Sequence, residues 1–385
     1  MLPRTSMTRV FLFSLTLLTF LTAGLFADDE EAYPESPVRR YEGVLGEAAQ
    51  VVALLQTRDN NAGVCYDLSY YPAATGLPIA LVSDGPANAD GMESFKELRP
   101  GTPEQPEEQV VGQLLLMVDD RLITGTWTSP DGITKLPVRL EERYPEGSVR
   151  LDQTHLQFAS TERVGLMSTG YERQLSFPQS FGKQRHPALD ETLAQLALSA
   201  VSPGERADPT VATFSKLLRA QVNAPYELEQ NFINSRSDAF HVRMNEAGIL
   251  TVEHRTEEYA GGAHGSYSST FHSINIADGN ELRFPDLVRG NVQEKWASLA
   301  AAQLLKDRQM KPGTALTEIG LYEDKLELSD DWFLVPGGIG FYYAPYEIGP
   351  YAAGSFEFVL PWKDIIEDLE IGSIAETLAS RFEGN

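Results

Sequence analysis

The sequence predicts an α+β protein, in which a small all-β barrel or sandwich precedes an α+β domain with a mainly antiparallel sheet. Short β-rich runs separated by turn residues fill residues 41–143. Helix-spaced apolar residues then mix with strand signals over residues 160–385. Two glycine-rich β segments stand out, residues 249–284 and 337–361, and we expect both to lie in one sheet.

The N-terminus has the pattern of an export signal. Arg4 and Arg9 precede an apolar run over residues 10–26, and Ala27 ends a stretch that resembles a cleavage site. We therefore expect a signal peptide at residues 1–27, followed by a charged, proline-containing linker at residues 28–40. The protein would be periplasmic or secreted, with no membrane contact after cleavage. Retention of the signal as an anchor stays open.

Charge is the outstanding feature of the composition. The chain has 31 basic and 55 acidic residues, a formal net charge of −24. Such a field disfavours nucleic acid and favours encounter with a basic partner. Acidity that merely keeps the protein dispersed is the alternative explanation. Cys65 is the only cysteine, so no disulfide can form within the chain.

The first domain consists of short strands with clear turns. Asp131 and Gly132 lie between two β runs and predict a hairpin. Residues 86–108 are rich in proline and charge and break the strand pattern, so we interpret them as a mobile insertion. The interior could hold a ligand at one mouth, but a packed interior is the simpler interpretation.

The second domain begins after a change of character at residues 144–160. Leu189 and Leu193 continue one helical spacing, and Phe214 and Leu218 a second one, which Asp208 and Pro209 would cap. Later helices begin near residues 291–294 and 373–376. The expected strands cover residues 162–178, 226–231, 239–244, 332–336, 339–343 and 356–360.

Catalysis and metal binding lack a sequence signature. His264 and His272 would lie roughly 26 Å apart on one strand, too far to share an ion. A nucleophile elbow of the Gly-x-Ser-x-Gly type is absent. Glu253, Glu257 and Glu258 alternate as on an exposed sheet face, although a carboxylate pair would suit acid–base chemistry. We assign no catalytic residue, no metal site and no cofactor.

Aromatic residues are the better candidates for a binding surface. Tyrosine gives a large contact area at low entropic cost, as protein-binding surfaces require. The same rings could instead form the edge of a core. His264, between glycines, could also hydrogen-bond the turn backbone and fix the reversal. The candidate binding residues are Tyr259, His264, Tyr267, Tyr346 and Tyr351.

Three segments carry a family resemblance: YAGGAHG at residues 259–265, SINIADGNEL at 273–282 and YYAPYEIGPYAAG at 342–354. Together they resemble the RsiV-type domain of exported bacterial proteins, over roughly residues 160–385. The resemblance implies an α+β fold. Members include the extracellular part of an anti-sigma factor that binds lysozyme, and accessory domains of cell-wall polysaccharide deacetylases. It therefore implies an envelope recognition module.

Function follows as an expectation with two alternatives. The leading hypothesis is an exported, non-enzymatic recognition protein that binds a basic protein such as lysozyme, or a cell-wall component such as peptidoglycan. A hydrolase acting on envelope glycan or ester is one alternative, and a structural envelope protein is the other. An enzyme would show converging carboxylates or a histidine in a cleft.

Overall fold

The protein is described here from a computed structural model. The described residues are 37–60, 63–85, 87–101, 108–119, 121–164, 167–182, 185–224 and 233–382. The expected signal peptide at residues 1–27, most of the expected linker and the expected strand at residues 226–231 lie outside them.

An N-terminal β-barrel is confirmed. Its strands run in sequence order and the sheet closes because β1 pairs with β8, from Tyr41 opposite Glu142 to Leu45 opposite Val138. Side chains such as Phe95 and Leu116, both 0% exposed, fill the interior. The eight strands are β1 (Pro37–Leu45), β2 (Ala49–Asn60), β3 (Gly63–Pro72), β4 (Ile79–Ser83), β5 (Glu93–Arg99), β6 (Gln109–Asp119), β7 (Leu122–Thr128) and β8 (Lys135–Glu142).

Two expectations about this region are wrong. Residues 86–108 contain β5, whose alternation was hidden by its charged residues although Phe95 points into the core. Residues 37–40 are not linker but the start of β1. Arg40 is buried there because its guanidinium donates to Glu42 at 2.6 Å and to Glu246 at 3.0 Å. The hairpin at Asp131 and Gly132 is confirmed between β7 and β8.

The sheet continues beyond the barrel as a central sheet of five further strands. The first residues of β1 pair with β9, so both parts belong to one 13-stranded sheet. All of its neighbours are antiparallel except β10 and β11, which are parallel because a helical crossover joins them. The added strands are β9 (Leu151–Val164), β10 (Met167–Ser180), β11 (Ile233–Glu246), β12 (Ile249–Tyr259) and β13 (Ser266–Asn275).

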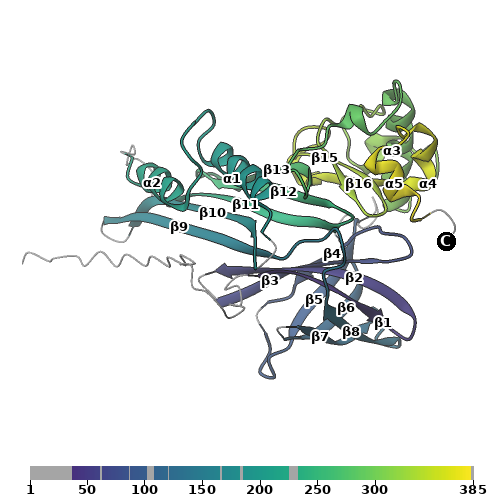
Figure 1. Ribbon diagram of the computed structural model, residues 1–385, viewed down its shortest axis with the longest axis horizontal. Helices are drawn as coiled ribbons and strands as arrows, with labels where there is room; N and C mark the ends of the chain where they lie inside the picture. Colours follow the sequence, from purple (N-terminus) through teal and green to yellow (C-terminus); the bar gives the residue numbers. More distant parts are fainter. Residues whose placement is uncertain are drawn as a thin grey trace, which may run out of the picture.

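The crossover consists of α1 (Pro187–Val201) and α2 (Val211–Val222), which cover one face of the central sheet in Figure 1. Leu193 of α1 and Phe214 of α2 are both 0% exposed and share a core with the sheet. The expected cap at Asp208, with Pro209 in the first turn, is two residues too early. Thr210 caps α2 instead, since its side chain accepts from the amide of Thr213 at 3.2 Å.

The C-terminal part has its own three-stranded sheet, with Trp296 at the centre of its core. Its strands are β14 (Trp332–Val335), β15 (Gly338–Tyr343) and β16 (Phe356–Pro361). Its helices are α3 (Gln293–Asp307), α4 (Trp362–Ile365) and α5 (Ile374–Ala379), with 3₁₀ turns η1 (Phe284–Asp286), η2 (Leu316–Ile319), η3 (Tyr351–Ala353) and η4 (Ile366–Asp368). Ser373 caps α5 as expected.

The α+β class is therefore wrong. The described part of the chain is mostly β, with 44% strand and 21% helix, because long strands continue from the barrel through the central sheet. The two glycine-rich segments also lie in different sheets. Since β15 already has β14 on one edge and β16 on the other, it has no free edge for β12 or β13. No helix in the described residues has the length and apolar character that crossing a membrane requires.

Candidate functional site

Four of the five predicted binding residues form one cluster, here called the aromatic patch: His264, Tyr267, Tyr346 and Tyr351. The rings of His264 and Tyr351 stack at a centroid distance of 3.8 Å. Tyr346 and Tyr267 flank Tyr351 at 5.5 Å and 6.2 Å. Tyr259 ends β12 in the same hairpin, and its hydroxyl donates to the carbonyl of Gly262 in the turn at 3.3 Å.

The patch joins two parts of the fold that are distant in sequence. His264 and Tyr267 come from the β12–β13 hairpin, and Tyr346 and Tyr351 from the segment after β15. The hairpin turn needs glycine, since Gly261 and Gly262 both have a φ of 92°. A Cβ on Gly265 would lie 2.8 Å from the carbonyl oxygen of Glu258, so this position also requires glycine.

One backbone carbonyl holds the two parts together. The oxygen of Gly265 accepts from the Tyr351 hydroxyl at 2.8 Å and from Nδ1 of His264 at 2.8 Å. A carbonyl only accepts, so Nδ1 of His264 carries a hydrogen. The structural role expected for His264 is therefore found, and its ring is at the same time part of the exposed aromatic surface.

Tyr346 is the most exposed tyrosine of the patch, at 59%. Its φ of 73° is unusual for a residue with a Cβ and costs of order 1–3 kcal/mol. The turn that holds it is closed twice, because Glu347 donates its amide to Ala344 at 3.1 Å and accepts the Ala344 amide at 2.8 Å. Such strain with an exposed ring is a common mark of a functional position.

A charged pair borders the patch on the hairpin side. The guanidinium of Arg255 lies 4.9 Å from the ring centre of Tyr267. Its Nε donates to Glu257 at 2.7 Å, and the Glu257 side chain is 56% exposed. Glu257 lies directly opposite Tyr267 in the β12–β13 ladder, so both project from the same face.

A second charged group, the Arg243 network, connects the two sheets beside the patch. Arg243 on β11 donates to Glu253 on β12 at 2.7 Å and to Glu357 on β16. Its guanidinium lies 5.8 Å from Phe271 and 5.6 Å from Phe333, whose rings stack at 4.2 Å. The network therefore fixes the C-terminal sheet against the central sheet.

The pKa values of the two carboxylates in this network are shifted in opposite directions. Burial raises the pKa of Glu357, and the charge of Arg243 only partly opposes this. For Glu253 burial also acts to raise the pKa, but Arg243, His241 and the other nearby donors together outweigh it, so the pKa is lowered. Our interpretation of Glu253 as part of an exposed sheet face is wrong, because the residue is 7% exposed under the C-terminal sheet. No local pattern predicts the pairing of Arg243 with Glu357, because the two residues are 114 positions apart in the chain.

The opposite face of the central sheet has a third group, the Asp238 network. The carboxylate of Asp238 accepts from Arg173 at 2.9 Å, Thr256 at 3.0 Å and His254 at 3.1 Å. Arg236 adds a bond at 3.2 Å. Burial favours the neutral acid, but these donors prevail and the pKa of Asp238 lies well below its usual range. Every oxygen is occupied, so this network suits stability rather than chemistry.

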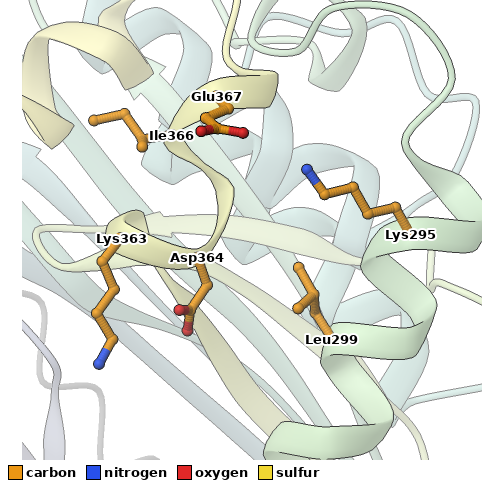
Figure 2. A pocket seen from close by; sticks show the side chains of 6 residues that line it. All are labelled: Lys295, Leu299, Lys363, Asp364, Ile366 and Glu367. Carbon is orange, nitrogen blue, oxygen red and sulfur yellow. The ribbon is translucent and has the colours of Figure 1, made fainter.

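Two hollows lie away from the aromatic patch. One hollow of about 340 Å³ lies between α3 and α4, where Lys295 and Lys363 stand on opposite sides in Figure 2. Another, of about 350 Å³, lies between α1 and the turn after β13, near Glu191 and Asp278. In the described ranges, no three His, Cys, Asp or Glu side chains are grouped so that they could hold a metal ion.

Residues 285–363 match the family described as "Protein of unknown function (DUF3298)". This segment is a DUF3298 domain. It contains α3, β14, β15, β16 and the loop with Tyr346 and Tyr351, whereas the β12–β13 hairpin lies outside it.

Solved DUF3298 structures are also similar to the chain. A family member from Bacteroides fragilis has 21% sequence identity and a TM-score of 0.48, over 60% of this chain and 99% of its own. A family protein from Pseudomonas aeruginosa has 16% identity and a TM-score of 0.45, over 58% of this chain and 95% of its own. No curated protein matches the sequence.

Proposed function

We propose that this protein is an exported recognition protein of the cell envelope, which binds a basic protein such as lysozyme through the aromatic patch. The observation that carries the proposal is the patch itself. Two distant segments meet there and present Tyr346, 59% exposed in a strained turn, beside Tyr351 and His264. Exposed tyrosines on a rigid support are what protein-binding surfaces use.

Charge supports a basic partner. The net charge of −24 steers cations toward the protein. Export rests on the signal-like pattern of residues 1–27, so the protein would act in the periplasm or outside the cell. The resemblance to the RsiV-type domain, which includes a lysozyme-binding member, supports the same partner.

The test is binding of the full chain to immobilised c-type lysozyme at physiological salt. We expect Tyr346→Ala to weaken binding by roughly tenfold or more, as for an aromatic hot spot worth about 1.4–3 kcal/mol. Ile133→Ala is the matched control, because Ile133 is 81% exposed on the β7–β8 turn of the barrel. This control should bind like the unchanged protein.

Salt separates specific recognition from general attraction. Binding that vanishes at modest salt and ignores Tyr346→Ala would be charge attraction alone and would contradict the proposal. If lysozyme does not bind at all, the same variants are tested on peptidoglycan fragments. Binding of those fragments that depends on Tyr346 would replace the protein partner with a cell-wall component.

A further inference from the structure

One guanidinium group already lies in a binding position at the edge of the aromatic patch. This position, here called the seat, is formed by Tyr267 and Glu257. Arg255 lies over the ring of Tyr267 at 4.9 Å while its Nε donates to Glu257 at 2.7 Å. A ring below and a carboxylate at the side are the two elements that hold such a cation. The seat is filled from the chain's own sequence, so it shows which group this surface accommodates.

The neighbouring rings have no such occupant. Among the described residues, no cation lies over Tyr346 or Tyr351, whereas arginines lie over Tyr144, Phe158 and Phe356 elsewhere in the protein. His264 covers one face of Tyr351, with the ring planes 15° apart. Tyr346 is tilted by 36° from Tyr351 and remains 59% exposed. Ring surface therefore stays open on the Tyr346 side.

We infer that the aromatic patch takes an arginine side chain of its basic protein partner, seated on Tyr346 next to Tyr351. This inference rests on the proposed function and specifies its contact. The planar, weakly hydrated guanidinium stacks on aromatic faces better than the compact ammonium of lysine. Arg255 does not repel the incoming cation strongly, because Glu257 neutralises it at 2.7 Å.

Two peptides of equal charge isolate this preference. The full chain is titrated at physiological salt with a peptide of nine arginines and with one of nine lysines, so that general attraction to the acidic protein is the same. We expect the arginine peptide to bind about two- to fivefold more tightly for each seated side chain. The preference should survive Tyr346→Phe, which keeps the ring, and disappear in Tyr346→Leu, which removes it. Equal affinity for the two peptides would overturn the inference.

Chemically modified lysozyme then separates this inference from the proposed function. Arginines are blocked with a dicarbonyl reagent in one sample, and an equal number of lysines is acetylated in another. The arginine-blocked sample should lose several-fold more affinity than the acetylated one. Unmodified lysozyme that binds, together with a blocked sample that binds like the acetylated one, refutes the arginine seat and leaves the proposed function standing. If the protein prefers the arginine peptide but does not bind lysozyme, the arginine seat on Tyr346 stands and lysozyme is refuted as the partner.

Discussion

The two faces of the central sheet each carry a charged network, and the two differ in what they connect. On the helix side, Asp238 and Arg173 are 0% and 1% exposed and lie on neighbouring strands under α2. On the other side, Arg243 and Glu357 keep 22% and 33% of their side chains exposed and bridge two sheets. The Asp238 network stabilises the central sheet and its helices. The Arg243 network also holds the two halves of the aromatic patch side by side.

The largest expected loss of stability comes from a substitution in the Asp238 network. Asp238→Ala leaves the guanidinium of Arg173 buried without its carboxylate, which should lower the free energy of unfolding by roughly 3–5 kcal/mol. Denaturant unfolding of the full chain measures this. Asp208→Ala, on the exposed loop before α2, is the control and should stay within about 0.5 kcal/mol. Equal losses in both variants would show that the network does not stabilise the fold.

Low pH should destabilise the protein through the same Asp238 network. Because the pKa of Asp238 is lowered in the folded protein, its contribution is complete above its ordinary pKa and is lost as pH falls toward the folded value. Between these values one such group gives a slope of about 1.4 kcal/mol per pH unit at most. Asp238→Asn should flatten the profile below about pH 4. A profile of unchanged slope in the variant would contradict the assignment.

Disrupting the Arg243 network should lower stability less than disrupting the Asp238 network, but it should also weaken binding. Arg243→Met leaves Glu253 and Glu357 facing each other without their cation. We expect about 1–3 kcal/mol lower stability, less than for Asp238 because water reaches both Arg243 and Glu357. Lysozyme binding should weaken as well, since the sheet that bears Tyr346 is less firmly held. A variant that is destabilised but binds normally would show that the two sheets stay together without this network.

The hydrogen bond from Tyr351 should give the smallest effect. Tyr351→Phe keeps the stack on His264 but removes the bond to Gly265, at a cost of about 0.5–1.5 kcal/mol. Hydrogen exchange of the hairpin amides around Gly265 is the sensitive measurement, and we expect faster exchange there. His254, in the Asp238 network, serves as the reference, because its amide should exchange at an unchanged rate.

Sequence patterns predicted local features and failed where distant parts meet. The barrel was predictable because turn residues such as Asp131 and Gly132 act locally. Arg40 and Glu93 obscured the strands that contain them, since a charge within a strand resembles a loop until its partner or its burial is known. The helical spacing was also predicted correctly for α1 and α2. These helices form the crossover between the parallel strands β10 and β11, so they cover a sheet in a protein that is mostly β.

The site shows the same limit. Aromatic residues near glycine and proline identified four members of the patch from their chemistry alone. Their common support, the carbonyl of Gly265, was not predictable, because backbone groups carry no sequence signal. Glu253 was misplaced for a related reason. The sequence around it alternates as on a surface strand, and Glu253 is buried only because the C-terminal sheet packs over it.

The position of β1 has a consequence for how the chain folds. This strand is among the first of the described residues, yet it pairs with β2 on one edge and with β8 and β9 on the other. The second edge stays open until about a hundred further residues have been synthesised, and pairing over such separations is slow. An open strand edge invites contact with other chains. Barrel closure is thus the step at which a holding chaperone would matter most to the newly made protein.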